Sequence, residues 1–223
     1  MDINALSILG NSSIGIFGYS TDTYGLFPYN TKEVDKEIII NTLQIEILSS
    51  TIVNSNLIGL FITGNDNHLL VPELISDSEL TILKDYLKDK DVEVSILDSK
   101  LTALGNLVVA NNKIALISPE FDKKDQIKIE DFLDVEIVAN KVLNSNLVGS
   151  MIFRNVNGLL AHPLIEEEEL EWISKLFNIK ADVVTVNRGT PFPRPGIIAN
   201  TNGILVGSDT TGPEIMRIFE VLS

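Results

Sequence analysis

Residues able to support metal or nucleophilic chemistry are few in this chain. Two histidines, His68 and His162, are present, and cysteine is absent. Without cysteine there are no disulfides, thiolate zinc sites, iron–sulfur ligands or thiol nucleophiles. The histidines differ in their placement, four residues before Pro72 and directly before Pro163, so they lack the close spacing of a metal-binding pair. We expect both to end strands with local hydrogen bonds and predict no metal site.

Catalytic motifs are also missing. The sequence has no GxSxG elbow, no Walker loop and no GxGxxG after a strand. The glutamate run from Glu166 to Glu169 is typical of a solvated helix face, with a divalent cation site as the alternative. A serine nucleophile such as Ser150 needs a positioned base, and His162 is the one candidate near it in sequence. We therefore predict no catalytic residue and no cofactor.

The arginines are unevenly placed, because all four follow residue 150. Arg154 and Arg217 are expected to be scattered surface charges. Arg188 and Arg194 flank a segment, 187–196, that contains three prolines and Phe192. Such a rigid loop could present two arginines and an aromatic side chain to a partner, although Phe192 could instead plug the core.

The overall charge bounds the class of partner. Acidic residues number 31 and basic residues 17, which gives a net charge of −14. This balance argues against electrostatic binding of naked nucleic acid or of a membrane surface, and it favours basic partners. The chain does not begin with a basic and apolar leader, and no apolar run approaches the roughly 18 residues of a spanning helix, so we expect a cytoplasmic protein.

Internal repeats define the organisation of the chain. The hexapeptide NSNLIG at 54–59 recurs as NSNLVG at 144–149, and a weaker copy, NSSIG, lies at 11–15. Prolines mark the same period, at Pro28, Pro72, Pro119 and Pro163. Five periods of about 45 residues account for residues 1–223.

Each period predicts the order strand, polar turn, strand, helix, strand. Asparagine-rich turns follow the first strands, and we expect them to use positive φ. Ser76 and Glu79 predict a capping box at the start of the clearest helix. First strands are expected at 14–19, 57–63, 107–110, 147–154 and 197–199, helices at 76–89, 166–177 and 213–222, and third strands at 39–48, 92–96, 135–139 and 182–186.

The fifth period lacks its third strand, whereas the N-terminus has a spare strand, expected at 6–9. Closing a ring solves both problems, because the N-terminal strand completes the last unit and covers its edge. We therefore predict a single-domain, five-bladed α/β propeller with pseudo-fivefold symmetry over residues 1–223. The alternative is two ordinary α/β domains of about 110 residues each.

Several longer strings carry a resemblance to a known family. They are LTALGN at 101–106, TVNRG at 185–189, GN at 64–65 leading to LLVP at 69–72, GLLAHP at 158–163 and GSDTT at 207–211. With these strings in order along the whole chain, the sequence resembles the translation initiation factor 6 family, in its archaeal, tail-less form. The resemblance implies a pentein-type α/β propeller. It also implies binding to the large ribosomal subunit on its subunit-joining face, steric prevention of association with the small subunit, and a role in large-subunit maturation.

The resemblance also suggests contact residues and partners. By motif position, ribosome binding is carried over to Asn106, Asn187 and Arg188, with Leu60 and Phe192 added. For the asparagines, a purely conformational role in turns is the alternative. The implied partners are basic ribosomal proteins, chiefly of the L14 type, near the sarcin–ricin loop, with little affinity for naked nucleic acid, no membrane contact and a monomeric state.

Three other functions compete with this one. Guanidine-modifying enzymes share the pentein fold, but their cysteine nucleophile is absent here. A homo-oligomeric or general protein-binding scaffold without ribosomal specificity is a second alternative. Direct RNA binding is a third, and it predicts a steep negative dependence of affinity on salt.

Overall fold

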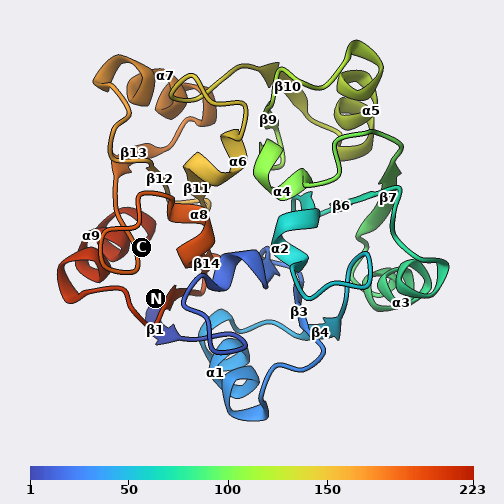
Figure 1. Cartoon of the computed structure of the whole chain (residues 1–223), viewed down its shortest axis with the longest axis horizontal. Coiled ribbons are helices and arrows are strands. Elements are labelled where there is room, and N and C mark those ends of the chain that lie inside the picture. The colour runs from blue at the N-terminus through green and yellow to red at the C-terminus, as the bar shows by residue number, and fades with distance from the viewer.

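The computed structural model describes residues 1–223, and its strands form five three-stranded blades around a common axis (Figure 1). Blade 1 contains β2 (Tyr19–Ser20), β3 (Gly25–Pro28) and β4 (Ile47–Ser50); blade 2 contains β5 (Thr63–Gly64), β6 (His68–Pro72) and β7 (Glu93–Leu97); blade 3 contains β8 (Val108–Ala110), β9 (Ile114–Ile117) and β10 (Glu136–Ala139); blade 4 contains β11 (Ile152–Arg154), β12 (Gly158–Ala161) and β13 (Lys180–Val183); blade 5 contains β14 (Ile197–Ala199), β15 (Gly203–Gly207) and β1 (Asp2–Leu6). The predicted α/β propeller is therefore confirmed.

Two kinds of helix accompany the blades. Long helices follow the second strands and lie at the outside of the ring: α1 (Glu33–Leu43), α3 (Asp77–Lys88), α5 (Lys123–Leu133), α7 (Glu167–Phe177) and α9 (Gly212–Leu222). The first four lead on to the third strand of the same blade. Short helices precede the first strands and surround the axis in Figure 1: η1 (Ile14–Ile16), α2 (Ile58–Phe61), α4 (Leu104–Leu107), α6 (Val148–Met151) and α8 (Pro193–Gly196). None of these helices combines the length and apolar character that crossing a bilayer requires.

Strand direction gives every blade two distinct ends. The first and second strands are antiparallel, and the second and third are parallel, as in the pairing of β3 with β2 and β4. The first strand therefore starts where the second and third strands finish. We call this the short-helix end, because the short helices lie there, and we call the opposite end, where the asparagine turns lie, the hairpin end.

The N-terminal strand closes the ring, as predicted. β1 pairs in parallel with β15 and completes blade 5, and the two chain termini lie close together there (Figure 1). The strand expected at 6–9 is wrong in position, because β1 spans Asp2–Leu6 and Leu9 has a positive φ of 53°. A left-handed residue cannot continue a strand.

The hydrophobic core is divided among the seams between blades. One cluster joins Leu6, Phe27 and Leu43 of the N-terminal part to Ile198 and Leu205 of blade 5. A second places Leu70 of blade 2 among blade 3 side chains. Because every cluster uses two neighbouring blades, no blade completes its core alone.

At three of the five seams, an asparagine side chain at a hairpin turn ties one blade to the next. Asn200 Nδ2 donates to the Leu43 carbonyl at the end of α1 (2.8 Å), and its Oδ1 accepts from the Asn202 and Gly203 amides of its own turn (3.0 and 3.1 Å). Asn65 and Asn155 make the same bonds to the last turns of α5 and α9. Each of these side chains is buried and fully hydrogen-bonded, so it holds a turn and a seam together.

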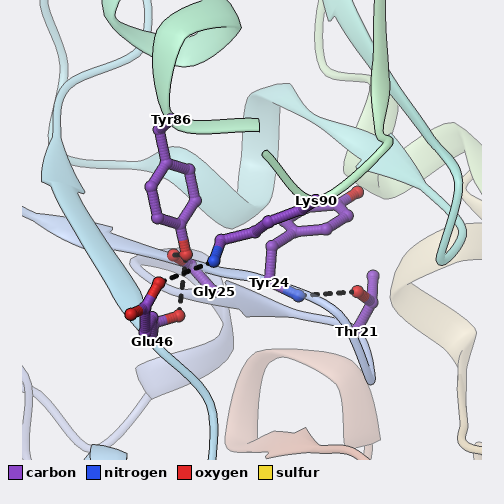
Figure 2. Close-up of polar contacts among 6 residues, drawn as sticks. All are labelled: Thr21, Tyr24, Gly25, Glu46, Tyr86 and Lys90. Atoms are coloured by element: carbon purple, nitrogen blue, oxygen red, sulfur yellow. Dashed lines mark hydrogen bonds and ion pairs between the residues drawn. The ribbon is translucent and has the colours of Figure 1, made fainter. Parts of the chain in front are cut away.

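The seam between blades 1 and 2 uses tyrosines instead. Thr21 stands at the turn position of blade 1, where its hydroxyl accepts from the Thr23 and Tyr24 amides of its own turn (3.1 and 3.3 Å). The Tyr24 hydroxyl donates to the Asn65 carbonyl of blade 2 (3.2 Å). Figure 2 shows the outer part of this seam, where the Tyr86 hydroxyl donates to the Glu46 carbonyl (2.7 Å). Lys90 pairs with the Glu46 carboxylate at 2.7 Å and lies over the Tyr86 ring. Burial raises the pKa of Tyr86 to about 12, so its proton stays in this bond.

The first strands expected at 14–19, 57–63 and 147–154 are wrong over their first halves, which form short helices. The reason is a close approach around the axis. A Cβ on Gly59 would lie 2.1 Å from the Gly15 carbonyl oxygen, and one on Gly105 would lie 2.0 Å from that of Gly59. Only glycine lets neighbouring short helices pack this tightly.

Two further expectations need correction. The third strand expected at 39–48 begins only at Ile47, because α1 continues to Leu43 and Gln44 ends it in the left-handed region. The asparagine turns at the hairpin end do not use positive φ. Gly203 is required there because a Cβ would lie 2.0 Å from the Thr42 carbonyl oxygen of the next blade. The predicted capping box at Ser76 and Glu79 is confirmed.

Candidate partner-binding face

Five loops at the short-helix end form the candidate binding face. They connect a third strand to the next short helix and span residues 7–13, 51–57, 98–103, 140–147 and 184–192. Four of them contain a tight reversal with two or more left-handed residues, closed by the bridges Ile8–Asn11, Ile52–Ser55, Val142–Ser145 and Val186–Thr190. Left-handed backbone at non-glycine residues persists only where neighbouring groups hold it.

Carboxylates in the first turns of the long helices hold these loops. In blade 5, Glu214 accepts from the Gly189 amide (2.9 Å), the Thr185 hydroxyl (2.8 Å) and the Thr211 amide (2.7 Å). Burial alone would raise the pKa of Glu214, but the hydrogen bonds outweigh it and lower the pKa to about 2. Glu79 holds the Asn54 amide (2.8 Å) in the same way in blade 2.

Two predicted contact residues occupy the same structural position in successive repeats. Leu60 is the third residue of α2, and Asn106 is the third residue of α4. Both are half-buried, at the edge of the face nearest the axis (Figure 1). Asn106 has a helical backbone rather than a positive φ, so a turn role for it is wrong.

Asn187 and Arg188 lie together on the blade 5 loop but differ in availability. The Asn187 side chain is committed internally, because Nδ2 donates to the Ser12 carbonyl (2.9 Å) and Oδ1 accepts from the Thr210 hydroxyl (3.1 Å). Arg188 is exposed, with φ of 63° and no ion pair. Asn187 therefore shapes the loop, and Arg188 is the side chain free to meet a partner.

Phe192 lies at the end of the same loop and is 36% exposed. Its ring meets His162 edge to face, with centroids 5.3 Å apart. His162 ends the second strand of blade 4, and its Nδ1 accepts from the Leu164 amide (3.2 Å), as expected for a strand-end residue. This ring contact joins blades 4 and 5 at the short-helix end.

The charge pattern of this face is a signal that sequence reasoning missed. The five loops contain a single acidic residue, Asp98, and three basic residues, Lys100, Lys141 and Arg188. Exposed apolar side chains lie on or beside them, including Leu147 (46% exposed) and Leu164 (76% exposed). The carboxylates of Glu79 and Glu214 that hold the loops are buried. Further acidic residues lie outside the loops, in the segments after the second strands: Glu73, Glu120, Asp122, Glu166 and Asp209. The face thus has an apolar, weakly basic centre and an acidic rim.

Two arginines do not lie where the sequence suggested. Arg154 was expected on the surface and Arg194 beside Phe192, but both side chains line the central channel, with Arg194 over the Tyr19 ring. The Arg154 Nε donates to the Ala110 carbonyl of the neighbouring blade 3 (2.7 Å). Arg217 does lie at the surface, paired with Asp182 (2.6 Å).

The geometry offers no assembled nucleophile. Ser150 Oγ donates to the Leu147 carbonyl (2.8 Å) rather than to a base. No three His, Asp or Glu side chains come together as a group able to hold a metal ion.

The ring of five blades defines the class of protein, an α/β propeller of the pentein fold. The structure is similar to the N-terminal domain of ArgZ, an arginine dihydrolase from cyanobacteria, with a TM-score of 0.56, 12% identity, and coverage of 84% of this chain and 74% of that one. It is also similar to DDAH from Pseudomonas aeruginosa, with a TM-score of 0.50, 14% identity, and coverage of 78% and 69%. At these identities the similarity shows the fold alone.

The chain belongs to the eIF-6 family, whose model matches residues 3–221. It is 43% identical over 223 residues to translation initiation factor 6 of Saccharolobus islandicus (strain L.S.2.15 / Lassen #1), covering 100% of this chain and 99% of that protein. The corresponding proteins of Staphylothermus marinus and Pyrococcus abyssi are each 37% identical, over 100% of this chain and 98% and 99% of theirs. The chain is therefore assigned to the translation initiation factors, a family of factors rather than of enzymes.

Proposed function

We propose that this protein binds the large ribosomal subunit on its subunit-joining face and prevents association with the small subunit by steric occlusion. Family membership supports a role in translation initiation, and the partner-binding face supplies the surface. The observation that carries the proposal is the pattern of that face, where exposed apolar side chains and Arg188 lie on five loops that contain one acidic residue, Asp98, while the carboxylates that hold the loops are buried. Apolar and arginine anchors inside a polar rim are the usual composition of a protein interface.

The charge pattern also suggests the kind of ribosomal partner. The acidic rim attracts basic ribosomal proteins, and the L14-type protein near the sarcin–ricin loop is the proposed docking site. With only three basic residues in the five loops and a net charge of −14, the chain has no basic surface for naked RNA. We further propose that it acts as a cytoplasmic monomer and also takes part in large-subunit maturation.

Cosedimentation with separated ribosomal subunits tests the proposal. We expect the protein to migrate with the large subunit only and to reduce the fraction of joined ribosomes when small subunits and magnesium are added. Failure to bind either subunit would remove the function and favour a scaffold. Binding to isolated ribosomal RNA with a steep salt dependence would favour direct RNA recognition instead.

A matched pair of variants locates the contact. Arg188→Glu changes the charge at the centre of the face, and Lys84→Glu makes a comparable change at an exposed position on α3. We expect Arg188→Glu to weaken large-subunit binding about tenfold or more, as for an arginine at the centre of an interface, and Lys84→Glu to leave it within about twofold. Leu60→Glu is expected to weaken binding in the same direction. Equal effects of Arg188→Glu and Lys84→Glu would exclude this face.

A further inference from the structure

The central channel holds two arginines in places where every other repeat has a small residue. The second residue of each short helix is Gly15, Gly59, Gly105 or Gly149, but it is Arg194 in α8. The last residue of each first strand is Ser20, Gly64, Ala110 or Ala199, but it is Arg154 in β11. At each of the two levels, one guanidinium therefore enters a space that four small residues leave open.

Neither guanidinium has a carboxylate partner. Arg194 makes one hydrogen bond, from Nη2 to the Gly59 carbonyl at 3.4 Å, and otherwise lies over the neutral Tyr19 ring. Arg154 donates to two backbone carbonyls, of Ala110 (2.7 Å) and Asn155 (3.4 Å). Arginine carries five N–H donors, so most of the donors of Arg194 and several of Arg154 have no protein acceptor.

The nearest carboxylates are already engaged. Asp22 accepts from the Thr201 amide (2.6 Å), and Asp66 accepts from the Asn112 side chain (2.7 Å), both at the hairpin end. Burial lowers the pKa of both arginines; Tyr19, Asp66 and Asp22 oppose this shift at Arg154, and Tyr19 opposes it at Arg194. The charge of Arg194 also lowers the pKa of Arg154. A half-buried, uncompensated cation is costly, and a bound anion would offset that cost.

The channel has room for such an anion. A cavity of about 80 Å³ is lined by Tyr19, Arg154, Arg194 and the polar residues of the hairpin turns. At roughly 10–15 Å³ for each water-sized position, this space holds several waters or one small oxyanion but not a nucleoside. Tetrahedral oxyanions accept several hydrogen bonds at once, which suits a cavity lined by two guanidiniums.

We propose that the channel binds one phosphate-sized oxyanion between Arg154 of blade 4 and Arg194 of α8, which leads into blade 5. Because Arg194 also donates to the Gly59 carbonyl of α2, the bound anion would connect these two blades with the opposite side of the ring. The site is independent of ribosome binding, because it faces the axis rather than the partner-binding face. The bound anion would stabilise the closed ring by satisfying donors that the protein leaves free.

Thermal unfolding with inorganic phosphate as the probe tests this proposal. Phosphate is titrated against chloride at constant ionic strength, so that general salt effects cancel. We expect the melting temperature to rise along a one-site saturation curve, and isothermal titration calorimetry to give a stoichiometry of about one. Arg194→Gln should abolish both responses, whereas Arg217→Gln, which changes a surface arginine, should keep them.

Titrations with two other anions distinguish a free inorganic oxyanion from the phosphate group of a nucleotide. Sulfate should replace phosphate, while adenosine monophosphate should not, because the cavity excludes the nucleoside. An equal rise in melting temperature for the native chain and Arg194→Gln would overturn the proposal, since it would show nonspecific stabilisation. Absence of a calorimetric signal with the folded native chain at millimolar phosphate would overturn it as well.

Discussion

Replacing Glu214 with glutamine tests how the blade 5 loop is held. Glu214 Oε1 accepts from the Thr185 hydroxyl and the Gly189 amide, and Oε2 accepts from the Thr211 amide and hydroxyl and, at 3.3 Å, from the Arg188 amide. Glutamine keeps the shape but turns one acceptor into a donor. Whichever way its amide lies, at least one backbone amide then loses its acceptor.

The magnitude follows from the pKa and from the bonds. The pKa falls from an ordinary value of 4.5 to about 2, which sets a ceiling of about 3 kcal/mol for the contribution of ionised Glu214 to the free energy of unfolding. Solvent screening near the surface reduces this contribution to about 2 kcal/mol. The cost of leaving one or two backbone amides without an acceptor is of the same size. We expect Glu214→Gln to lower the free energy of unfolding by about 2 kcal/mol at pH 7.

The pH dependence has a definite sign. Because the folded pKa is lowered, this stabilisation is complete above the unfolded pKa near 4.5 and is lost as the pH falls through about 2. Urea unfolding of the native chain and of the variant should therefore differ by less than half as much at pH 3 as at pH 7. Hydrogen exchange at the Gly189 and Thr211 amides should be faster in the variant at pH 7.

The control is Glu220→Gln, at an exposed position on the same helix, which should change stability by less than about 0.5 kcal/mol. A difference between the native chain and Glu214→Gln that stays constant from pH 7 to pH 3 would refute the reasoning, because protonated glutamate should resemble glutamine. Unchanged hydrogen exchange at the Gly189 and Thr211 amides of the variant would also refute it.

Other predictions concern the ring. Gly59→Ala should cost about 3 kcal/mol or more, because its Cβ would lie 2.1 Å from the Gly15 carbonyl oxygen, while Gly212→Ala, with open space around it, should be nearly neutral in urea unfolding. Asn200→Ala should cost about 3 kcal/mol through its lost seam bonds, and an exposed asparagine, Asn30, should tolerate alanine. Tyr86→Phe should cost about 1 kcal/mol, because the hydroxyl loses its bond to the Glu46 carbonyl (2.7 Å) and a long contact with the Gly25 carbonyl (3.5 Å); a cost near zero would show that water replaces the bond. Because the cores straddle seams, calorimetry should show one cooperative transition, and two separate transitions would favour two domains.

Much of the ring could be predicted because the repeat contains residue types that favour particular local structures. The asparagine turns and the recurring glycine string mark the same places in four of the five units, and the capping box at Ser76 marks the start of one long helix. The short helices could not be predicted, because apolar runs such as 57–63 suit a strand equally well. What decides their form is contact between glycines of neighbouring repeats, as between Gly15 and Gly59, which is a tertiary effect.

The candidate site was only partly accessible from the sequence. Motif position assigned Arg188 and Leu60 to one binding surface, and both lie at the short-helix end, but the Asn187 side chain is committed to Ser12 and Thr210. The channel position of Arg194 could not be predicted from the sequence. Arg194 occupies the second position of its short helix, where the other four short helices have glycine, and this correspondence is visible only once the helix bounds are known. The apolar centre of the face was missed because its residues come from five separate loops.

The orientation of the protein on the large subunit is the measurement that tests the account most directly. A cryo-electron microscopy map of the complex should place the short-helix end, with Leu60, Asn106 and Arg188, against ribosomal protein at the subunit-joining face. The hairpin end, with Asp22 and Asp66, should point away from the large subunit, toward the position of the small subunit. A map with the hairpin end against the large subunit, or with the protein bound away from the joining face, would contradict the account.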